Sequence, residues 1–280
     1  MNDDEIIKMY NGNLEKIIKL MKENNVSLDK LEQIILNAKQ KEEEPLKIDL
    51  GNKSFYYCYF ADPHIGHKQF NKKMFDYMVK MIKQKKPDFV INVGDTLEGM
   101  SGRDGHIYEL EKIGFDEQFN YAVELLSKIP VTIYGIDGNH DMWYHSKFNI
   151  GIIVGKKLEE VLDNYVHLGQ MDGSITIDGI KIKLFHANDK SAFGMSYQIE
   201  KLIDALEGEN KPNILHSGHY HKYLYIFRRN IHAFESGTLC NQTLFMKGKK
   251  IVPYVGFGFV KVYHNKNGEV SRIEEEFYTE

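Results

Sequence analysis

Five short groups of polar residues in this chain carry side chains of the kind that bind divalent metal ions. In chain order they supply a carboxylate with an imidazole, a carboxylate, an amide with an imidazole, a single imidazole, and a pair of imidazoles. Seven of these eight side chains are candidate ligands: Asp62, His64, Asp95, Asn139, His186, His219 and His221. Because this set offers oxygen and nitrogen without sulfur, it suits borderline divalent ions such as manganese, iron or zinc.

The first two groups each have an ordinary structural alternative. Asp62 and His64 are separated by one residue, so both side chains can turn toward one point, but a turn residue beside a surface imidazole would look the same. Asp95 follows Gly94 at the end of an apolar run. It is either a helix cap or turn residue, or a carboxylate that bridges two metal ions. These residues alone leave both alternatives open.

The histidine groups carry the same ambiguity when they are taken one at a time. His186 ends an apolar run and could be a structural histidine. His219 and His221 lie two residues apart on a segment that we expect to be extended, so their rings would point to the same side and suit two neighbouring metals. The joint pattern favours a metal centre, because the alternative is that seven unrelated polar residues match seven ligand positions by chance.

The third group, Gly138-Asn139-His140-Asp141, adds candidates for catalysis. Gly138 permits an unusual backbone, and Asn139 offers a neutral carbonyl ligand. His140 can face a substrate while Asp141 orients its ring. A polar turn is the alternative explanation, but four such residues in this order favour the catalytic interpretation.

All five groups follow segments whose apolar patterns predict strands, and open α/β sheets place ligand sites at such strand ends. From residue 55 onward predicted strands and helices alternate, which is typical of a layered α/β core. The predicted strands are residues 55–60, 89–93, 131–136, a hairpin around 175–184 with its turn at 178–179, 214–216, 223–227, 231–234 and 255–263. The predicted helices are residues 70–82, 115–126, 150–162 and 196–206.

Residues 1–44 differ in pattern from the rest of the chain. Apolar residues recur at helical spacing on both sides of Asn24, and Ser27 is placed to cap the second helix. The pattern predicts a helical hairpin that precedes a catalytic domain at residues 45–280. A DNA-binding helix-turn-helix is the alternative, but the turn has no glycine and the second helix is not basic. This favours a hairpin that packs on the domain or binds a protein partner.

Composition limits the kind of protein this chain can be. Its 280 residues, 42% of them hydrophobic, can build one main domain with a real core. The net charge of -4 gives no general attraction for nucleic acid. Local clusters such as Lys247, Lys249 and Lys250 could contact phosphates or could be a solvated face. Without an apolar stretch of about 20 residues, and with two distant cysteines, we expect a cytoplasmic protein that has no membrane span, disulfide framework or thiolate metal cluster.

The motifs together resemble those of the calcineurin-like metallophosphoesterase superfamily, over residues about 55 to 240. The matching segments are Asp62-Pro63-His64, Gly94-Asp95, Gly138-Asn139-His140-Asp141, His186 and Gly218-His219-Tyr220-His221. The resemblance implies an α/β fold with four layers, an α-β-β-α sandwich of two mixed sheets flanked by helices. It also implies two metal sites that share Asp95. Asp62, His64 and His221 would complete one site, and Asn139, His186 and His219 the other.

The same resemblance implies a hydrolytic mechanism with a pair of divalent ions. Manganese is the expected metal, with iron, zinc and magnesium as alternatives. The ions would lower the pKa of a shared water, so that a bridging hydroxide attacks phosphorus, and would neutralise the phosphate oxygens. His140 is not a ligand in this pattern, so it is free to stabilise the transition state or protonate the leaving oxygen, held by Asp141.

Two insertions beside the predicted centre supply candidate substrate contacts. The glycine-rich segment 98–106 carries Arg103 and His106, which could clamp a phosphate unless the segment is only a surface loop. The segment 142–148 adds Trp143 and Tyr144 beside His140. These rings could stack an unpaired base or pack against a neighbouring helix.

We therefore predict a metal-dependent phosphodiester hydrolase, and more narrowly a nuclease acting on DNA or RNA. The helical appendage before the core is similar to the nuclease branch of the superfamily, although Glu235-Ser236-Gly237 departs from the family's Asn-Pro-Gly turn. A phosphatase or small-molecule phosphodiesterase and a non-catalytic scaffold of a nucleic-acid complex are the alternatives. The expected partners are a nucleic-acid substrate and a protein bound through the N-terminal helices, with no membrane.

Overall fold

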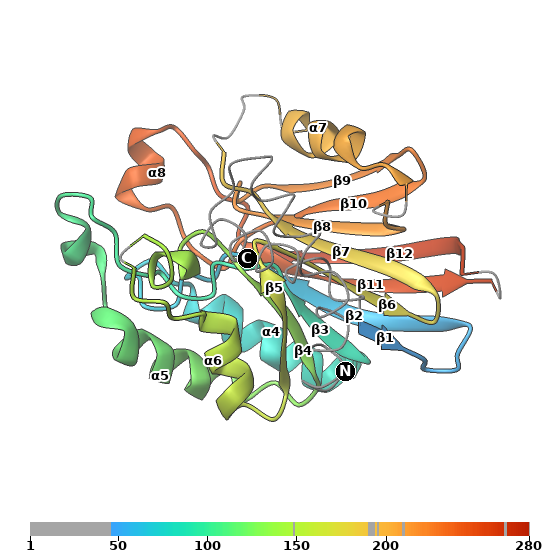
Figure 1. The fold of residues 1–280 in the computed structure, drawn as a ribbon, viewed down its shortest axis with the longest axis horizontal. Helices are drawn as coiled ribbons and strands as arrows, with labels where there is room; N and C mark the ends of the chain where they lie inside the picture. Colours follow the sequence, from blue (N-terminus) through green and yellow to red (C-terminus); the bar gives the residue numbers. More distant parts are fainter. Residues whose placement is uncertain are drawn as a thin grey trace, which may run out of the picture. The chain divides into compact units, whose positions relative to one another are not determined.

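The computed structural model of the chain describes residues 46–147, 149–189, 194, 196–208, 211–265 and 268–279. The helical hairpin expected at residues 1–44 lies outside these residues, so it and the domain boundary at residue 45 stay predictions. The described residues belong to one unit that is built on two six-stranded sheets (Figure 1).

Both sheets mix parallel and antiparallel strands. The first sheet has the order β1-β6-β7-β8-β10-β9 and the second the order β12-β11-β2-β3-β4-β5. The first contains β1 (Leu46–Ile48), β6 (Asp172–Ile177), β7 (Ile180–His186), β8 (Ile214–Gly218), β9 (Tyr223–Arg228) and β10 (Ile231–Ser236). The second contains β2 (Ser54–Phe60), β3 (Phe89–Asn92), β4 (Ile133–Asp137), β5 (Tyr165–Gln170), β11 (Gly256–His264) and β12 (Val270–Thr279).

Helices cover the outer faces of both sheets. The second sheet is covered by α4 (Lys72–Lys85), α5 (Gly114–Leu126) and α6 (Val154–Val161), and the first by α7 (Tyr197–Ala205) on the opposite side (Figure 1). The short helix α8 (Leu244–Gly248) stands apart from the sheets, and two 3-10 turns are η1 (His106–Glu109) and η2 (Asp141–Trp143). This order of layers confirms the predicted α-β-β-α sandwich.

Strand β2 is apolar on both faces because its sheet is covered on both sides. Tyr57 and Tyr59 point into the apolar layer between the two sheets. Cys58 and Phe60 point the other way, into the layer beneath the helices. All four side chains are fully buried. Burying a large apolar side chain contributes roughly 1.5–3 kcal/mol, so a slip of one residue in this strand would be costly.

Helix α4 begins two residues later than the pattern predicts, because Asn71 caps it. The Asn71 side chain accepts a hydrogen bond from the backbone N–H of Met74 at 2.9 Å. The helix ends where Lys86 takes a left-handed conformation with φ of 49°. Its apolar face is buried against the second sheet, as the predicted spacing requires.

The apolar patterns do not predict β1, β5, β12 or α8. Strand β12 is the clearest case, because Glu274, Glu275 and Glu276 follow one another and acidic residues are depleted in strands. Its pairing with β11 overrides that preference. Glu275 also accepts hydrogen bonds from the hydroxyls of Tyr59 and Tyr223, each at 2.7 Å.

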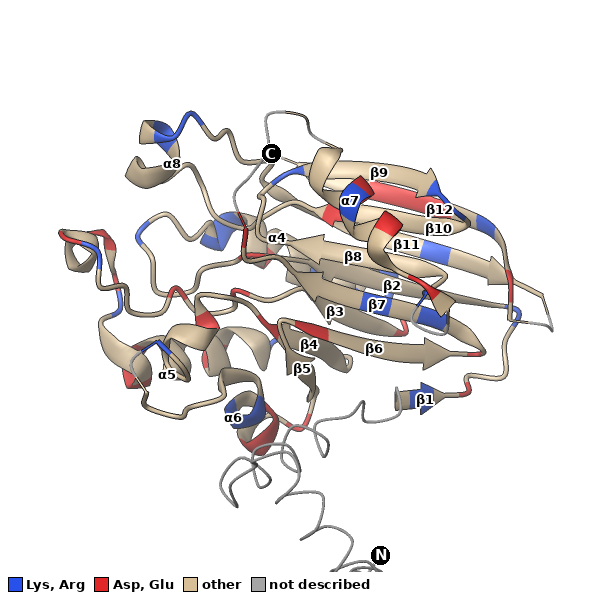
Figure 2. Ribbon diagram, turned by 45° about the horizontal axis from the view of Figure 1, so that its top comes forward, with Lys and Arg blue, Asp and Glu red and all other residues tan. Residues whose placement is uncertain are grey.

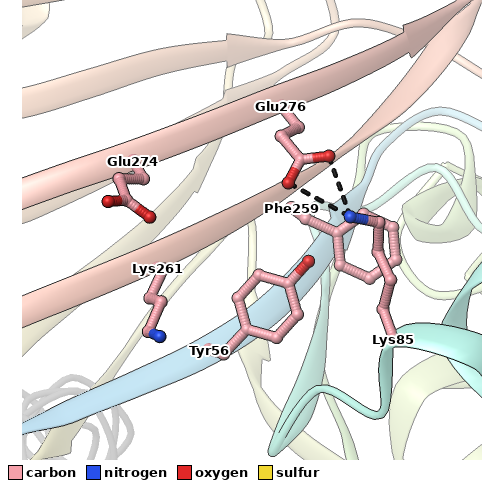
Figure 3. A pocket seen from close by; sticks show the side chains of 6 residues that line it. All are labelled: Tyr56, Lys85, Phe259, Lys261, Glu274 and Glu276. Atoms are coloured by element: carbon pink, nitrogen blue, oxygen red, sulfur yellow. Dashed lines mark hydrogen bonds and ion pairs between the residues drawn. The ribbon is translucent and has the colours of Figure 1, made fainter.

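Lys85 and Glu276 join the end of α4 to β12 at a shallow hollow on the helix-covered side of the second sheet (Figure 3). Lys85 Nζ lies 2.8 and 3.1 Å from the Glu276 carboxylate oxygens and 5.5 Å from the centre of the Phe259 ring. The remaining lining residues are Tyr56, Lys261 and Glu274. Such a partly exposed pair contributes little stability, and β12 is held mainly by its pairing with β11.

Neither cysteine has the surroundings of a reactive thiol. Cys58 and Cys240 are buried and free, and burial raises the pKa of both thiols well above the usual range. Within the described ranges no helix combines the length and the apolar composition that a bilayer crossing demands.

Candidate metal centre

All seven predicted ligands come together where parallel strands of the two sheets end. Strands β2, β3 and β4 are parallel neighbours, and they lead into Asp62, His64, Asp95 and Asn139. Strands β7 and β8 are parallel neighbours, and they lead into His186, His219 and His221. The ligands therefore meet at the carboxyl ends of strands, where α/β sheets commonly bind ligands.

The first cluster contains Asp62, His64 and His221, whose donor atoms all lie within 4.8 Å of one another. The Nε2 atoms of His64 and His221 face each other at 3.1 Å, and Asp62 Oδ1 lies 3.3 Å from His221 Nε2. Asp95 Oδ2 is 3.7 Å from His64 Nε2. Imidazole nitrogens and carboxylate oxygens that converge in this way form a donor set for a divalent ion.

The second cluster contains Asp95, His186 and His219, again with donor atoms within 4.8 Å of one another. Asp95 Oδ2 lies 3.2 Å from His186 Nε2. Asn139 Oδ1 lies 3.1 Å from His186 Nε2 and 2.8 Å from His219 Nδ1. Because Asp95 Oδ2 also approaches His64, Asp95 can serve both clusters, and its 3.2 Å distance to His186 Nε2 is shorter than the 3.9 Å from Asp62 Oδ1 to the same atom.

Five of the seven candidate ligands have a left-handed backbone conformation, which residues other than glycine seldom adopt. Their φ angles are 48° at Asp62, 50° at His64, 49° at Asp95, 86° at His219 and 54° at His221. A left-handed residue costs on the order of 1–2 kcal/mol. Such conformations persist where the surrounding structure imposes them, and they concentrate at ligand sites. Packing alone does not account for five of them around one point.

The prediction of an extended segment through His219 and His221 is wrong. Both residues follow the end of β8 in left-handed conformations, which breaks the alternation of side chains along a strand. His219 joins Asp95, whereas His221 joins Asp62. The two rings therefore reach neighbouring clusters through turns.

Three buried carboxylates give the centre a negative charge that only histidines oppose. Asp62, Asp95 and Glu98 are almost completely buried, and their ion-pair partners among the described residues are all histidines. Burial raises the pKa of Asp62, but His221 and His186 outweigh it and hold the value below the usual range. The pKa of Asp95 also lies well below its usual range. Divalent cations fit this site because they would balance the buried charge.

Glu98 contacts three histidines, although its place in the sequence indicates only the start of a loop. Its Oε2 lies 2.8 Å from His64 Nδ1, its Oε1 lies 2.6 Å from His106 Nε2, and its backbone oxygen lies 2.8 Å from His140 Nδ1. Burial lowers the pKa of His64, but Glu98 reverses this and the pKa rises to about 9. The only sequence feature that indicates a role for Glu98 at the metal centre is its place three residues after Asp95.

We expect Glu98→Gln to weaken metal binding by about 10- to 100-fold, the usual effect of removing a group that orients a ligand. The carboxylate holds the His64 proton on Nδ1, so a metal ion that displaces the proton on Nε2 finds that nitrogen aimed at the cluster. Isothermal titration with manganese measures the effect. Glu111→Gln removes an exposed glutamate from the same stretch of chain and should bind like the wild type. Equal affinities for the two variants would contradict this role.

His140 lies beside both clusters and is partly exposed, unlike His64 and His186. Its Nδ1 must carry a proton, because the Glu98 backbone oxygen at 2.8 Å can only accept one. Its Nε2 is then left for other chemistry. Burial lowers the pKa of His140 to about 4, so the free ring is neutral near pH 7. Trp143 packs against it with ring centres 4.0 Å apart.

The prediction that Asp141 orients the His140 ring is wrong. Both Asp141 oxygens accept backbone hydrogen bonds, from Leu97 at 2.8 Å, Gly138 at 2.9 Å and Thr96 at 3.0 Å. Asp141 is buried and ties the turn after β4 to the turn after β3. Asp141, although it is next to His140 in the chain, therefore does not hold the His140 ring.

Gly138 lies where any side chain would displace Asp95. A Cβ atom there would lie 2.2 Å from Asp95 Oδ1 and 2.4 Å from its backbone nitrogen. We expect Gly138→Ala to destabilise the protein by about 1–3 kcal/mol and to lower its metal content, because overpacking shifts neighbouring groups. Gly102→Ala is the control, since its added Cβ would meet nothing within 4 Å. Thermal unfolding and metal analysis test both variants, and unchanged metal content in Gly138→Ala would refute the expectation.

Two of the predicted substrate contacts are wrong because the side chains are buried. His106 bonds to Glu98, and its Nδ1 accepts a hydrogen bond from the Ser101 backbone at 3.2 Å. It therefore has no nitrogen left for a phosphate. Tyr144 is 2% exposed and packs edge-on against Phe115 in the core, so it cannot stack a base.

The other two predicted substrate contacts are partly exposed. Trp143 supports His140 and has Lys147 Nζ 4.2 Å from its ring centre. Arg103 pairs with Glu109 at 2.9 Å and keeps 40% of its side chain exposed. For these two residues, substrate contact stays a prediction.

Comparison with known proteins identifies one family model and several relatives. The model described as calcineurin-like phosphoesterase matches residues 55–256. The DNA polymerase II small subunit of Archaeoglobus fulgidus is 26% identical over 271 aligned positions, covering 81% of this chain and 54% of the relative. The DNA polymerase II small subunit of Methanothermobacter thermautotrophicus is 24% identical over 247 positions, covering 72% and 51%. The chain thus spans about half the length of the curated relatives it matches.

Solved structures with a related fold include two phosphoesterases. An archaeal phosphodiesterase aligns with a TM-score of 0.48 and 12% identity, over 80% of this chain and 99% of the other. The phosphoesterase Yfce from E. coli aligns with a TM-score of 0.43 and 12% identity, over 78% and 98%.

Proposed function

Because the chain belongs to the calcineurin-like phosphoesterase family, we propose that it hydrolyses phosphodiester bonds with two bound divalent metal ions. The observation that carries this proposal is the convergence of seven donor residues from five strand ends into two adjoining clusters. Asp62, His64 and His221 would hold one ion, and Asn139, His186 and His219 the other, with Asp95 shared. The donor set suits manganese, with iron, zinc and magnesium as alternatives.

Bound at these clusters, the ions would neutralise phosphate oxygens and activate a water molecule. The residues of the chain do the remaining work. Glu98 orients His64 toward the first cluster and His140 toward the space beside both. Because the neutral His140 ring has no proton on Nε2, this atom first takes up a proton and then donates it to a phosphate oxygen or to the leaving oxygen.

We propose nucleic acid, and DNA before RNA, as the substrate. The support comes from relatives that are named as subunits of a DNA polymerase. Their designation as small subunits also supports a protein partner for this chain. The cytoplasmic location expected from the sequence stays a prediction.

A second candidate is a non-catalytic subunit of a nucleic-acid complex, which the names of the same relatives favour. Two observations support catalysis over this role. The complete donor set converges although its backbone is left-handed at five positions, and His140 stands partly exposed beside the clusters. A scaffold has no need to keep either feature.

One assay panel tests the proposal. The 280-residue chain is incubated with single-stranded DNA, double-stranded DNA, RNA, a chromogenic phosphodiester and a chromogenic monoester, each with manganese, magnesium and zinc. We expect cleavage of DNA and of the small diester, highest with manganese. Turnover of small esters alone would end the nuclease proposal. Two bound metals without any turnover would favour the scaffold.

A further inference from the structure

The segment that carries α8 leaves the candidate metal centre beside one ligand and returns beside another. At its start the Thr238 hydroxyl donates to the backbone oxygen of Asp62 at 2.7 Å, and the Leu239 N–H donates to the same atom at 3.3 Å. At its end the Tyr254 N–H donates to the backbone oxygen of His221 at 2.8 Å. The two ends of the segment 238–254 are therefore anchored beside ligands of the first cluster.

This segment has its own internal hydrogen bonds. The Thr243 hydroxyl accepts a hydrogen bond from the Met246 N–H at 3.1 Å and caps α8. The Ile251 N–H donates to Met246 at 2.9 Å, and Gln242 Nε2 donates to the Ile251 oxygen at 2.7 Å. Its outward side chains are thus presented on an ordered support.

The outward surface of residues 241–254 is basic and apolar. The segment contains no aspartate or glutamate, although the chain as a whole has a net charge of -4. Its exposed lysines are Lys247, Lys249 and Lys250, which give α8 and the residues after it their basic colour in Figure 2. Phe245 is 47% exposed, and Leu244 and Val252 are 74% and 70% exposed.

Phe245 has cations from two segments over its ring. The Arg103 guanidinium carbon is 5.5 Å from its ring centre, and Lys249 Nζ is 6.0 Å away. Arg103 belongs to the segment that leaves the centre at Asp95. A half-exposed ring covered by cations suits a single-stranded nucleic acid, because phosphates can draw the cations off the ring and a base can then stack on it.

We infer that residues 241–254 together with Arg103, called here the α8 surface, bind a single-stranded polynucleotide whose backbone leads into the metal centre. This inference rests on the proposed function and adds the surface that holds the substrate. A protein partner could cover Leu244 and Val252. Three lysines in a segment without a carboxylate give a protein partner no general attraction. They do attract a polyanion.

Binding of a fluorescent oligo-dT strand of about 20 nucleotides to the whole 280-residue chain, measured by anisotropy in metal-free buffer, separates binding from hydrolysis. Phe245→Leu keeps an apolar side chain but removes the ring, and it should weaken binding by about 5- to 150-fold. Phe245→Trp should keep the affinity. The triple change of Lys247, Lys249 and Lys250 to alanine should also reduce the slope of log affinity against log salt by about 2.

The matched control is the double change Lys156→Ala and Lys157→Ala, which removes exposed lysines from α6 and should bind like the wild type. Wild-type protein that does not bind the strand, or α8 variants with wild-type affinity, would overturn the inference. Loss of a protein partner with unchanged oligonucleotide affinity would also overturn it.

The same variants are assayed with manganese on a chromogenic phosphodiester, which is too small to need the α8 surface. We expect wild-type rates. Oligonucleotide binding that depends on α8 without any ester hydrolysis would refute the proposed function and leave the inference standing. Ester hydrolysis together with oligonucleotide binding that does not depend on α8 would support the proposed function and overturn the inference.

Discussion

Replacing His140 by alanine should lower phosphodiesterase activity by about 100- to 10,000-fold while the protein keeps its bound metals. The ring contacts the Glu98 backbone through Nδ1 and packs on Trp143, so it is held without help from a metal. Its removal takes a proton-transfer group from beside both clusters and leaves the seven donor residues in place. Steady-state rates and metal analysis of the purified variant measure the two effects separately.

The control for His140→Ala is His232→Ala, which removes a partly exposed histidine from β10 of the first sheet. It should keep wild-type rates. If His140→Ala lost a metal ion, His140 would be a ligand and its assigned role would be incorrect. If it kept both its metals and its activity, the proton transfer would have to come from another group.

Asp95→Asn should have a still larger effect, because Asp95 approaches donors of both clusters. Its Oδ2 lies 3.2 Å from His186 and 3.7 Å from His64, and its low pKa keeps it ionised at neutral pH. A neutral amide of the same shape removes the shared charge. We expect the metal content to fall to one ion or none and hydrolysis to fall below detection.

The same variant should also lose stabilisation by metal. A ligand that binds only the folded state stabilises it, by about 2.7 kcal/mol at a concentration 100 times its dissociation constant. Manganese should therefore raise the melting temperature of the wild type and of Asp76→Asn, a control that removes an exposed carboxylate from α4. Two ions in Asp95→Asn, or an undiminished shift in its melting temperature, would argue that Asp95 is not shared.

Much of the fold follows from local patterns in the sequence. Apolar runs locate β2, β3 and β4, and helical spacing locates α4 and α5, because each pattern records which faces of an element are buried. The alternation of these elements predicts the layered α/β fold, and the resemblance to a known superfamily predicts its four layers. Both predictions are confirmed. Strand β12 is missed because its stability depends on partners elsewhere in the chain.

The types and spacing of the polar residues also predict the candidate ligands. A side chain's donor atoms are set by its own chemistry, and its place after a strand brings it to one edge of a sheet. Asp62, Asp95 and His186 can therefore be selected without coordinates. That they converge within a few ångströms of one another is a property of the two sheets together.

Tertiary structure decides which side chains face the substrate and which support the site. His106 and Tyr144 lie close to candidate residues in the chain but are buried, whereas Glu98 becomes the partner of His64 because two loops fold against each other. Asp141 adjoins His140 in sequence and still bonds elsewhere. Burial and hydrogen-bond partners depend on distances between segments far apart in the chain, so local sequence determines what a residue can do and the packed fold determines what it meets.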